Sequence, residues 1–374
     1  MKQLIKIAII FTVLNCFSAI AGVVEHKLEI KSSVVKQTLD FSVFVPADYE
    51  TETEQKYVVV LTTAGRSRLQ TVVQQVQWLS HVDFAPLPRA ITVSLPYIDP
   101  EQLAEKSADT NALYVEEFKQ ELFPLLAKKF RTHPYRIIEG FSTWANLPLS
   151  IYRDHPETFN AYFVFAPALE LADDNFVSKF SAKKFKQGYR NRALFLSRDD
   201  FAGNQTQFER LQSLLERSNK DKQTQIIVRD YRQHNYLSNP NVGLVEATEA
   251  VFADLAPDFD MFSDSGVDGL EVYLDRLVKK YGFDMDKTGK TISMAFHFAD
   301  SKAYGKAFEV MEHVIANEPD NLLAHVRLAQ LQIRGAYNNE ALKTLEQASK
   351  MAEQQQDHEV QSFVANLKRQ LLEG

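Results

Sequence analysis

The chain has 374 residues, of which 45% are hydrophobic and 24% are charged, and its formal net charge is -7. This composition is typical of a globular protein with one large and one smaller domain, and the negative charge argues against general binding to nucleic acid or anionic membranes. The only cysteine, Cys16, lies in the apolar N-terminal segment, which excludes disulfides, thiolate catalysis and cysteine metal sites from the rest of the chain.

The first 21 residues have the pattern of an export signal. Lys2 and Lys6 precede an apolar run, Ile7 to Phe17, that is too short to span a bilayer comfortably. Ala19-Ile20-Ala21 then supplies small residues at the two positions that a signal peptidase recognises. We expect residues 1–21 to be a signal peptide, and the mature protein to be periplasmic or secreted without a membrane span. An uncleaved anchor or a buried N-terminal helix is the alternative.

From residue 22 to residue 257, short apolar runs alternate with helical patterns, which predicts a mostly parallel sheet with flanking helices. The β-branched runs Tyr57–Thr62 and Ala90–Leu95 are typical of strands buried on both faces. Further strands are expected at Arg136–Ile138, Ala161–Phe165, Ala193–Ser197 and Gln225–Val228, after an opening hairpin at Val34–Val45. Helices are expected at Leu69–Leu79, Tyr114–Phe130, Gln207–Arg217 and Val245–Leu255.

After Pro257 the strand patterns end, and we expect a linker and connecting helix over residues 258–287 followed by helices over residues 288–374. Ala307 and Ala341 lie 34 residues apart, and so do Ala295 and Ala329. A period of 34 with small residues at fixed positions resembles the tetratricopeptide repeat, in which paired helices approach closely. We expect repeats at Thr288–Asn321 and Leu322–Ala348 and a capping helix at His358–Leu372, which together could bind a protein partner. An irregular helical bundle is the alternative.

The sequence Gly140-Phe141-Ser142 follows the expected strand Arg136–Ile138 and precedes a helical pattern, Leu147 to Tyr152. A serine between a buried strand and a helix is the context of a nucleophile elbow, in which a strained turn exposes the serine Oγ above the sheet. The N-terminus of the following helix then points N–H groups at a developing oxyanion. The alternative for Ser142 is a helix N-cap with no catalytic role.

The order of the other candidates along the chain agrees with this reading. An acid, Asp199 or Asp200, follows the strand Ala193–Ser197, and His234 lies in the loop after the last strand. Nucleophile, acid and base in this order are the arrangement of the α/β-hydrolase fold. We favour Asp200 over Asp199 as the acid, and a solvent-exposed loop histidine is the alternative for His234.

Candidates for the oxyanion donors are the backbone N–H groups of Gly65, Arg66 and Thr143. Arg66 or Arg68 could instead hold an anionic substrate, although arginines in a surface loop are usually solvated.

Residues Tyr57 to Pro257 resemble the esterase family of α/β-hydrolases that includes trilactone siderophore esterases. The resemblance rests on FKQELFPLLAKKFRTHPY at Phe118–Tyr135 and HPETFNAY at His155–Tyr162, followed by Ala166-Pro167-Ala168-Leu169 and by His234 within Tyr231–Asn235. Some members of that family also carry a tetratricopeptide tail, which agrees with the repeat found here.

This chain departs from the family motifs at the elbow and at the oxyanion loop. The family usually reads Gly-His-Ser-x-Gly-Gly, whereas Phe141, Trp144 and Ala145 replace the histidine and both later glycines. The family's Leu-Asp-Gly loop, which helps to form the oxyanion hole, reads Thr63-Ala64-Gly65 here. Because glycine at the position of Trp144 lets the helix pass close to the turn, Trp144 predicts a looser or re-routed elbow.

The leading hypothesis is therefore a serine esterase that cleaves a small-molecule carboxylic ester through an acyl-enzyme intermediate, with no cofactor and no metal. The alternative is a catalytically degenerate hydrolase-like protein that acts as a binding or scaffold module through its helical tail. Trp144 favours the alternative, whereas the retained serine, acid and histidine favour the enzyme.

Overall fold

The computed structural model describes residues 19–20, 22–82, 85–96, 108–172, 175–182, 187–219, 222 and 224–373. The chain divides into two units, Met1–Ala256 and Pro257–Gly374. Most of the expected signal peptide lies outside the described residues, but Ala19–Ile20 form a short strand, β1, that pairs antiparallel with Val23–Val24. In the described part of the chain, no helix combines the length and the apolar character needed to cross a bilayer.

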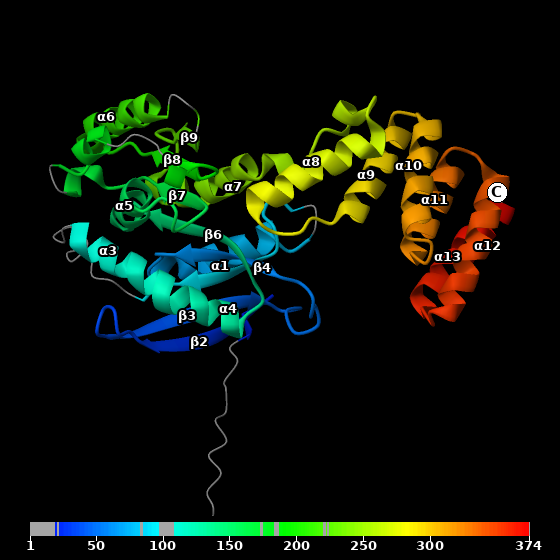
Figure 1. Cartoon of the computed structure of the whole chain (residues 1–374), viewed down its shortest axis with the longest axis horizontal. Helices are drawn as coiled ribbons and strands as arrows, with labels where there is room; N and C mark the ends of the chain where they lie inside the picture. Colours follow the sequence, from blue (N-terminus) through cyan, green and yellow to red (C-terminus); the bar gives the residue numbers. More distant parts are fainter. Residues whose placement is uncertain are drawn as a thin grey trace, which may run out of the picture. The chain divides into compact units, whose positions relative to one another are not determined.

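Nine strands in the described part of the first unit form one sheet, in the order β1-β2-β3-β5-β4-β6-β7-β8-β9 (Figure 1). The first three strands and β5 pair antiparallel, and all pairs from β5 to β9 are parallel. The strands are β2 (Val23–Lys31), β3 (Thr38–Pro46), β4 (Tyr57–Thr62), β5 (Ala90–Ser94), β6 (Thr132–Phe141), β7 (Ala161–Phe165), β8 (Ala193–Arg198) and β9 (Gln225–Asp230). The predicted mostly parallel sheet with flanking helices is confirmed.

Helices cover both faces of this sheet (Figure 1). On one face, α1 (Arg66–Leu79) packs against α7 (Asn239–Val251). A Cβ at Gly243 would lie 2.6 Å from the Phe165 ring, so only glycine lets α7 pack this closely on β7. A continuous core on the other face joins the strands to α3 (Ala108–Glu117), α4 (Phe123–Lys129), α5 (Asn146–Asp154) and α6 (Ala202–Ser218).

The opening hairpin lies earlier in the chain than we expected, because β2 supplies its first strand and Val34 and Val35 lie in the turn. Leu28 and Ile30 on β2 are buried, whereas Glu29 between them is exposed, which is the alternation of a half-buried strand. The expected helix Tyr114–Phe130 is also interrupted, because Phe118–Leu122 form one π-helical turn between α3 and α4.

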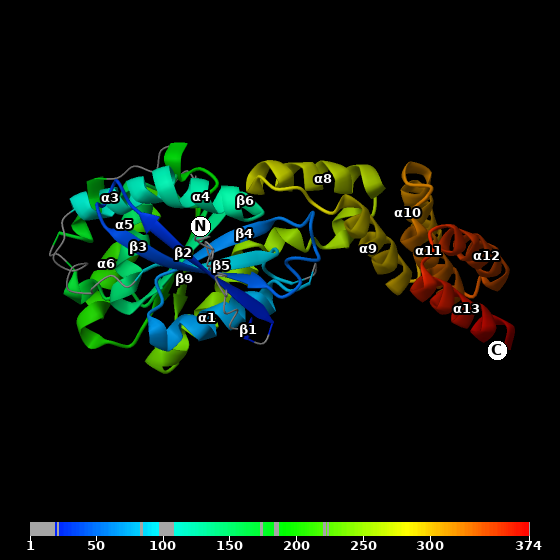
Figure 2. The same ribbon diagram turned by 90° about the horizontal axis from the view of Figure 1, so that it is seen from below.

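The second unit is helical throughout its described elements. The segment expected as a linker and connecting helix contains a short 3₁₀ helix, Phe259–Phe262, and α8 (Gly266–Tyr281). Two helical pairs and a last helix follow, which lie side by side in sequence order (Figure 2): α9 (Lys287–Asp300) with α10 (Tyr304–Asn317), α11 (Leu322–Arg334) with α12 (Asn338–Gln354), and α13 (His358–Glu373). The four alanines that define the 34-residue period are fully buried or nearly so, as close helix crossings require.

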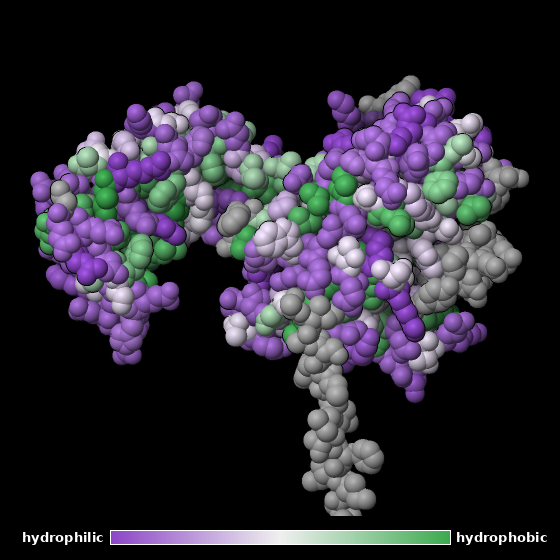
Figure 3. Space-filling model, turned by 180° about the vertical axis from the view of Figure 1, so that it is seen from behind, coloured by the Kyte–Doolittle hydropathy of each residue, from purple (hydrophilic) through white to green (hydrophobic). Residues whose placement is uncertain are grey.

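The face of the molecule seen in Figure 3 is mostly hydrophilic, with hydrophobic residues scattered over both units. Large exposed hydrophobic side chains in the second unit are spread over several helices and include Val272 on α8, Leu323 on α11, and Phe363 and Leu372 on α13. Scattered exposure of this kind is ordinary for a folded protein and does not by itself indicate a binding surface.

Glu117 is an exception to the apolar composition of the first core. It is the last residue of α3, before the π-helical turn, and it is fully buried. Neither of its carboxylate oxygens has a hydrogen-bond partner among the described residues. Burial, together with the nearby charge of Glu121, raises the pKa of Glu117 to about 7.

This raised pKa predicts a pH-dependent stability. An unfolded chain releases the Glu117 proton near pH 4.5, whereas the folded chain keeps it until about pH 7. Folding stability is therefore lost progressively as the pH rises between these values. We expect Glu117→Gln, which cannot ionise, to unfold at a higher denaturant concentration than wild type at pH 8.5, by on the order of 3 kcal/mol.

The difference in unfolding free energy between wild type and Glu117→Gln should be smaller at pH 5, where Glu117 is protonated in the folded wild type. The matched control is Glu116→Gln, because Glu116 is an exposed neighbour on the same helix. If Glu117→Gln changed the unfolding free energy equally at both pH values, the raised pKa of Glu117 would be contradicted.

Candidate active site

Ser142 lies in a sharp turn at the end of β6. The strand ends at Phe141, Ser142–Ala145 form one 3₁₀ turn, and α5 begins at Asn146. The backbone of Ser142 has a φ of 61°, in the left-handed region that residues with a side chain rarely adopt. Such strain at a serine between a buried strand and a helix is the conformation of a nucleophile elbow.

Gly140 makes this turn possible without the later glycines of the family motif. A Cβ at Gly140 would lie 2.6 Å from the Trp144 carbonyl oxygen and 2.9 Å from both the Ala145 Cα and the Thr63 Oγ1. The close crossing of strand and helix therefore occurs at Gly140, two residues before the serine. The 3₁₀ geometry of the first turn accommodates Trp144, so the elbow is re-routed rather than absent.

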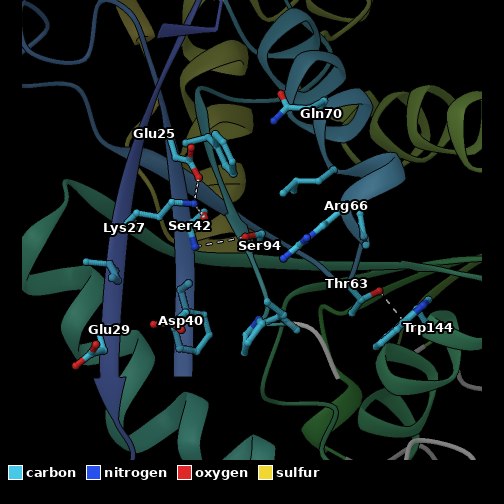
Figure 4. A pocket seen from close by; sticks show the side chains of 18 residues that line it. Glu25, Lys27, Glu29, Asp40, Ser42, Thr63, Arg66, Gln70, Ser94 and Trp144 are labelled. Atoms are coloured by element: carbon cyan, nitrogen blue, oxygen red, sulfur yellow. Dashed lines mark hydrogen bonds and ion pairs between the residues drawn. The ribbon is translucent and has the colours of Figure 1, made fainter. Parts of the chain in front are cut away.

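The Trp144 side chain lines a cavity beside the elbow instead of filling the turn (Figure 4). The cavity has a volume of about 840 Å³ and lies against β2, β3, the end of β5 and the loop Thr63–Arg66. The Thr63 hydroxyl donates to the Trp144 carbonyl oxygen at 3.4 Å, which joins this loop to the elbow. The loop and the elbow therefore form one wall of the cavity.

A buried ion pair lies directly beneath the elbow. Glu139, next to Gly140, is fully buried, and Arg68 donates from one terminal nitrogen to both of its carboxylate oxygens, at 2.9 and 2.7 Å. The Thr62 hydroxyl also donates to Glu139, and the Arg68 guanidinium lies 5.8 Å from the centre of the Phe141 ring. Arg68 is thus held by the protein, which leaves Arg66 as the arginine of this loop that is exposed at the cavity.

The expected oxyanion donors lie at two helix starts near Ser142. Arg66 is the first residue of α1, and Gly65 precedes it as the N-cap without a side-chain hydrogen bond. The Ala64 N–H is already used, because it donates to Thr62 Oγ1 at 2.9 Å. The N–H groups of Arg66 and Thr143 lie in first turns, where amides have no partner within their own helix. These groups can therefore stabilise an anionic oxygen.

The two candidate acids follow β8 and differ in their surroundings. Asp199 is 3% exposed and accepts hydrogen bonds from the Phe201 N–H at 3.0 Å and from Asn204 Nδ2 at 3.2 Å. Burial raises the pKa of Asp199, and the charges of Glu170 and Asp200 act in the same direction. Asp200 is exposed.

Asn204 connects Asp199 to the loop after β7. It is 1% exposed, donates to the Pro167 carbonyl at 2.7 Å and accepts from the Leu169 N–H at 2.9 Å. The Ala168 N–H in that loop donates to the Ser142 carbonyl at 3.3 Å. Asn204 could not be predicted from the sequence, because an asparagine in a helix gives no signal of its role without its neighbours in space.

His234 lies in the loop after β9, as expected, but the structure does not bring its ring to Ser142. The backbone N–H of His234 donates to the Tyr231 carbonyl at 2.9 Å, and its ring packs edge-on to the Tyr231 ring at 5.5 Å. Among the described residues, the ring nitrogens of His234 hydrogen-bond to neither Ser142 nor the two aspartates.

Tyr236, two residues further on, lies close enough to Ser142 to interact with it. Its hydroxyl interacts with the Ser142 side chain, and its ring lies 4.7 Å from that of Phe141 and 4.8 Å from that of Phe201. Burial raises the pKa of Tyr236, the charges of Asp199 and Glu170 raise it further, and the contact with Ser142 opposes them. Tyr236 therefore stays a neutral phenol at physiological pH. In the sequence, the position of Tyr236 two residues after His234, the candidate base, was the signal that could have indicated its place in the site.

A separate group of potential metal ligands lies in the second unit. One ligand atom from each of Asp258, Asp260 and His297 lies within 4.8 Å of the others. His297 Nε2 lies 2.8 Å from Asp260 Oδ1, and Asp258 accepts from the Asp260 N–H at 3.0 Å. These contacts account for the group as a hydrogen bond and a turn that hold the segment before α8 against α9.

Comparison with known proteins agrees with this architecture. A family model described as "Putative esterase" matches residues 32–241, and a tetratricopeptide repeat model matches residues 298–367. No curated protein sequence matches the chain.

Three solved structures illustrate the similarity in fold. An uncharacterised protein from Capnocytophaga ochracea is 14% identical with a TM-score of 0.60, and the match covers 94% of this chain and 100% of that one. An IroE-like serine hydrolase from Shewanella oneidensis is 15% identical with a TM-score of 0.59, over 78% of this chain and 99% of that one. The enterochelin esterase of Shigella flexneri is 17% identical with a TM-score of 0.50, over 62% and 59%.

At these identities the structural matches establish the fold alone, whereas the family model covers more than half of the chain. This chain therefore belongs to the esterase family of the α/β-hydrolase fold and carries a tetratricopeptide repeat segment in its second unit.

Proposed function

We propose that this protein hydrolyses carboxylic esters with Ser142 as the nucleophile. The observation that supports this most strongly is the φ of 61° at Ser142, between a buried strand and the first turn of a helix. Backbone strain of this kind persists where the surrounding structure imposes it, and it is concentrated at functional sites. The family match supports the same chemistry.

In the proposed reaction the Ser142 oxygen attacks the ester carbonyl while His234 takes the serine proton. The backbone N–H groups of Gly65, Arg66 and Thr143 stabilise the negative oxygen of the tetrahedral intermediate. His234 then gives the proton to the leaving alcohol, and water releases the acid from the serine by the same steps.

Burial favours Asp199 over our earlier choice, Asp200, as the acid of this site. The charge of Asp199 acts on Tyr236, so Asp199 lies close to the residue that contacts Ser142. Asp200 is exposed to solvent, where a carboxylate orients a histidine less effectively because water competes for it.

The triad is tested with short-chain aryl esters and with a fluorophosphonate, which labels only an activated serine. We expect Ser142→Ala and His234→Ala each to lower kcat by at least about 10³-fold, and the double variant to be little worse, because triad members act together. Asp199→Asn should lower kcat more than Asp200→Asn. Wild-type protein that neither cleaves esters nor reacts with the fluorophosphonate would contradict the proposal and favour a binding module.

Tyr236 is proposed to hold the Ser142 hydroxyl in the resting enzyme, so that His234 reaches the serine only after the loop around it rearranges. Tyr236→Phe removes the hydroxyl and keeps the ring between Phe141 and Phe201. Because the phenol no longer acts on the Ser142 hydroxyl in the resting state, we expect fluorophosphonate labelling to be about two- to tenfold faster than in wild type.

Tyr231→Phe is the matched control, because Tyr231 packs on the His234 ring and, among the described residues, has no hydrogen bond to Ser142. Slower labelling of Tyr236→Phe would instead mean that the phenol assists the reaction as a donor.

We further propose that the protein is exported, on the basis of Lys2, Lys6 and the small residues Ala19 and Ala21. Protein isolated from a bacterial periplasm should have the intact mass of a chain that begins at or near Gly22. A species that retains the first 21 residues would contradict export with cleavage.

A further inference from the structure

The cavity beside the elbow is placed and sized to bind part of a substrate. Its volume of about 840 Å³ falls within the usual range of ligand pockets, roughly 300–1,000 Å³. Trp144, two residues after Ser142, closes one side, and the loop Thr63–Arg66 runs beside it (Figure 4). A group bound here would therefore adjoin an ester carbonyl held between Ser142 and the proposed oxyanion donors.

The cavity wall carries charges of both signs. Glu25 and Lys27 pair with each other on β2, and the Lys27 ammonium also donates to Ser42 Oγ at 2.8 Å. Glu29 and Asp40 are opposite each other in the β2–β3 register. In Figure 4, Arg66 extends toward this wall from the side of the elbow.

This mixture of positive and negative side chains favours some chemical classes of ligand over others. A simple anion would meet the three carboxylates of β2 and β3, and a simple cation would meet Arg66 and Lys27. A purely aliphatic group would cover the apolar side chains that also line the cavity, such as Leu69 and Leu95, but it would remove the charged side chains from water without compensation. A hydroxyl group both donates and accepts, so it can bond to the carboxylates and to the guanidinium alike. A neutral, hydroxylated ring fits best, and the flat indole of Trp144 offers its apolar face.

The position of the cavity indicates which part of the ester it receives. The leaving alcohol takes its proton from His234, so in the proposed reaction it lies toward the loop that carries His234. The residues that line the cavity all lie between Glu25 and Trp144 in the chain, on the side of the oxyanion loop. The cavity thus suits the acyl part, which remains bonded to Ser142.

We propose, on the basis of the esterase function above, that this cavity binds the acyl part of the substrate and that this acyl part is a hydroxylated ring such as that of a sugar acid. With the methyl ester of glucuronic acid, Ser142 Oγ bonds to the carbonyl carbon and methanol leaves with the proton held by His234. Water then breaks the acyl–serine bond and releases glucuronate.

The first experiment compares methyl glucuronate with methyl cyclohexanecarboxylate, which has a six-membered ring and the same leaving group but no hydroxyls. We expect kcat/KM for the glucuronate ester to be at least about tenfold higher, because a site built for hydroxyls loses bonds with the analogue. Equal rates, or faster cleavage of the cyclohexane ester, would overturn the proposed class. Faster cleavage of methyl 6-O-acetylglucoside, whose sugar is the alcohol, would overturn the assignment to the acyl part.

A variant pair tests the cavity itself. Glu29→Gln, in the cavity wall, should lower the ratio of kcat/KM for the two methyl esters by about tenfold, because it removes a charge-assisted hydrogen bond. Glu54→Gln is the matched control, an exposed glutamate outside the cavity, and should leave that ratio unchanged. If Glu29→Gln had the same ratio of kcat/KM for the two methyl esters as wild type, binding of the acyl part in this cavity would be contradicted.

Direct binding separates this inference from the proposed catalysis. Methyl glucuronate should bind to Ser142→Ala, measured by ligand-observed NMR or calorimetry, and bind more weakly when Glu29→Gln is added. Binding by Ser142→Ala, combined with a wild type that fails to react with fluorophosphonate, would uphold the cavity and reject the esterase. If wild type cleaved esters but Ser142→Ala did not bind methyl glucuronate selectively, the esterase function would be upheld and the proposed role of the cavity rejected.

Discussion

The close crossing at Gly140 is the constraint on which the candidate site depends. A side chain there would come within 3 Å of the backbone of the following turn, so the strand can run into the elbow only with glycine at this position. This crossing turns the chain so sharply that Ser142 takes a φ of 61°. In the proposed enzyme, the serine is exposed because of a packing restriction two residues earlier. The family's later glycines are dispensable because the crossing occurs before them.

The ion pair of Glu139 with Arg68 stabilises the end of β6 just before this crossing. A fully buried carboxylate is costly unless it is paired and hydrogen-bonded, and here Arg68 and the Thr62 hydroxyl satisfy it. The pair ties α1 to β6, so the loop Thr63–Arg66 and the turn at Ser142 are held at one distance from each other. Glu117, by contrast, is buried without a partner and stays neutral until about pH 7. The two glutamates show that burial is tolerated either through pairing or through protonation.

The surroundings of Ser142 differ on its two sides. On one side, Trp144 and the loop Thr63–Arg66 border a cavity whose wall combines charged side chains of both signs with apolar side chains. On the other side, Tyr236 lies between the rings of Phe141 and Phe201 and contacts the serine. In the proposed enzyme, one part of the ester would meet the charged side chains of the cavity and the other part would meet aromatic rings, which would distinguish its acyl and alcohol parts. This asymmetry is the physical basis of the proposed selectivity.

The sequence by itself determined the parallel sheet, the strand–Gly-x-Ser–helix motif and the 34-residue helical repeat, because each depends on local periodicity or on spacing along the chain. It could not show that Arg68 is committed to Glu139, that Asp199 is buried while Asp200 is exposed, or that Tyr236 reaches Ser142. Those facts depend on which strand ends and loops meet in space. Trp144 illustrates the difference best: its presence predicted a changed elbow, but only the packing at Gly140 decided that the turn survives and that the indole lines a cavity.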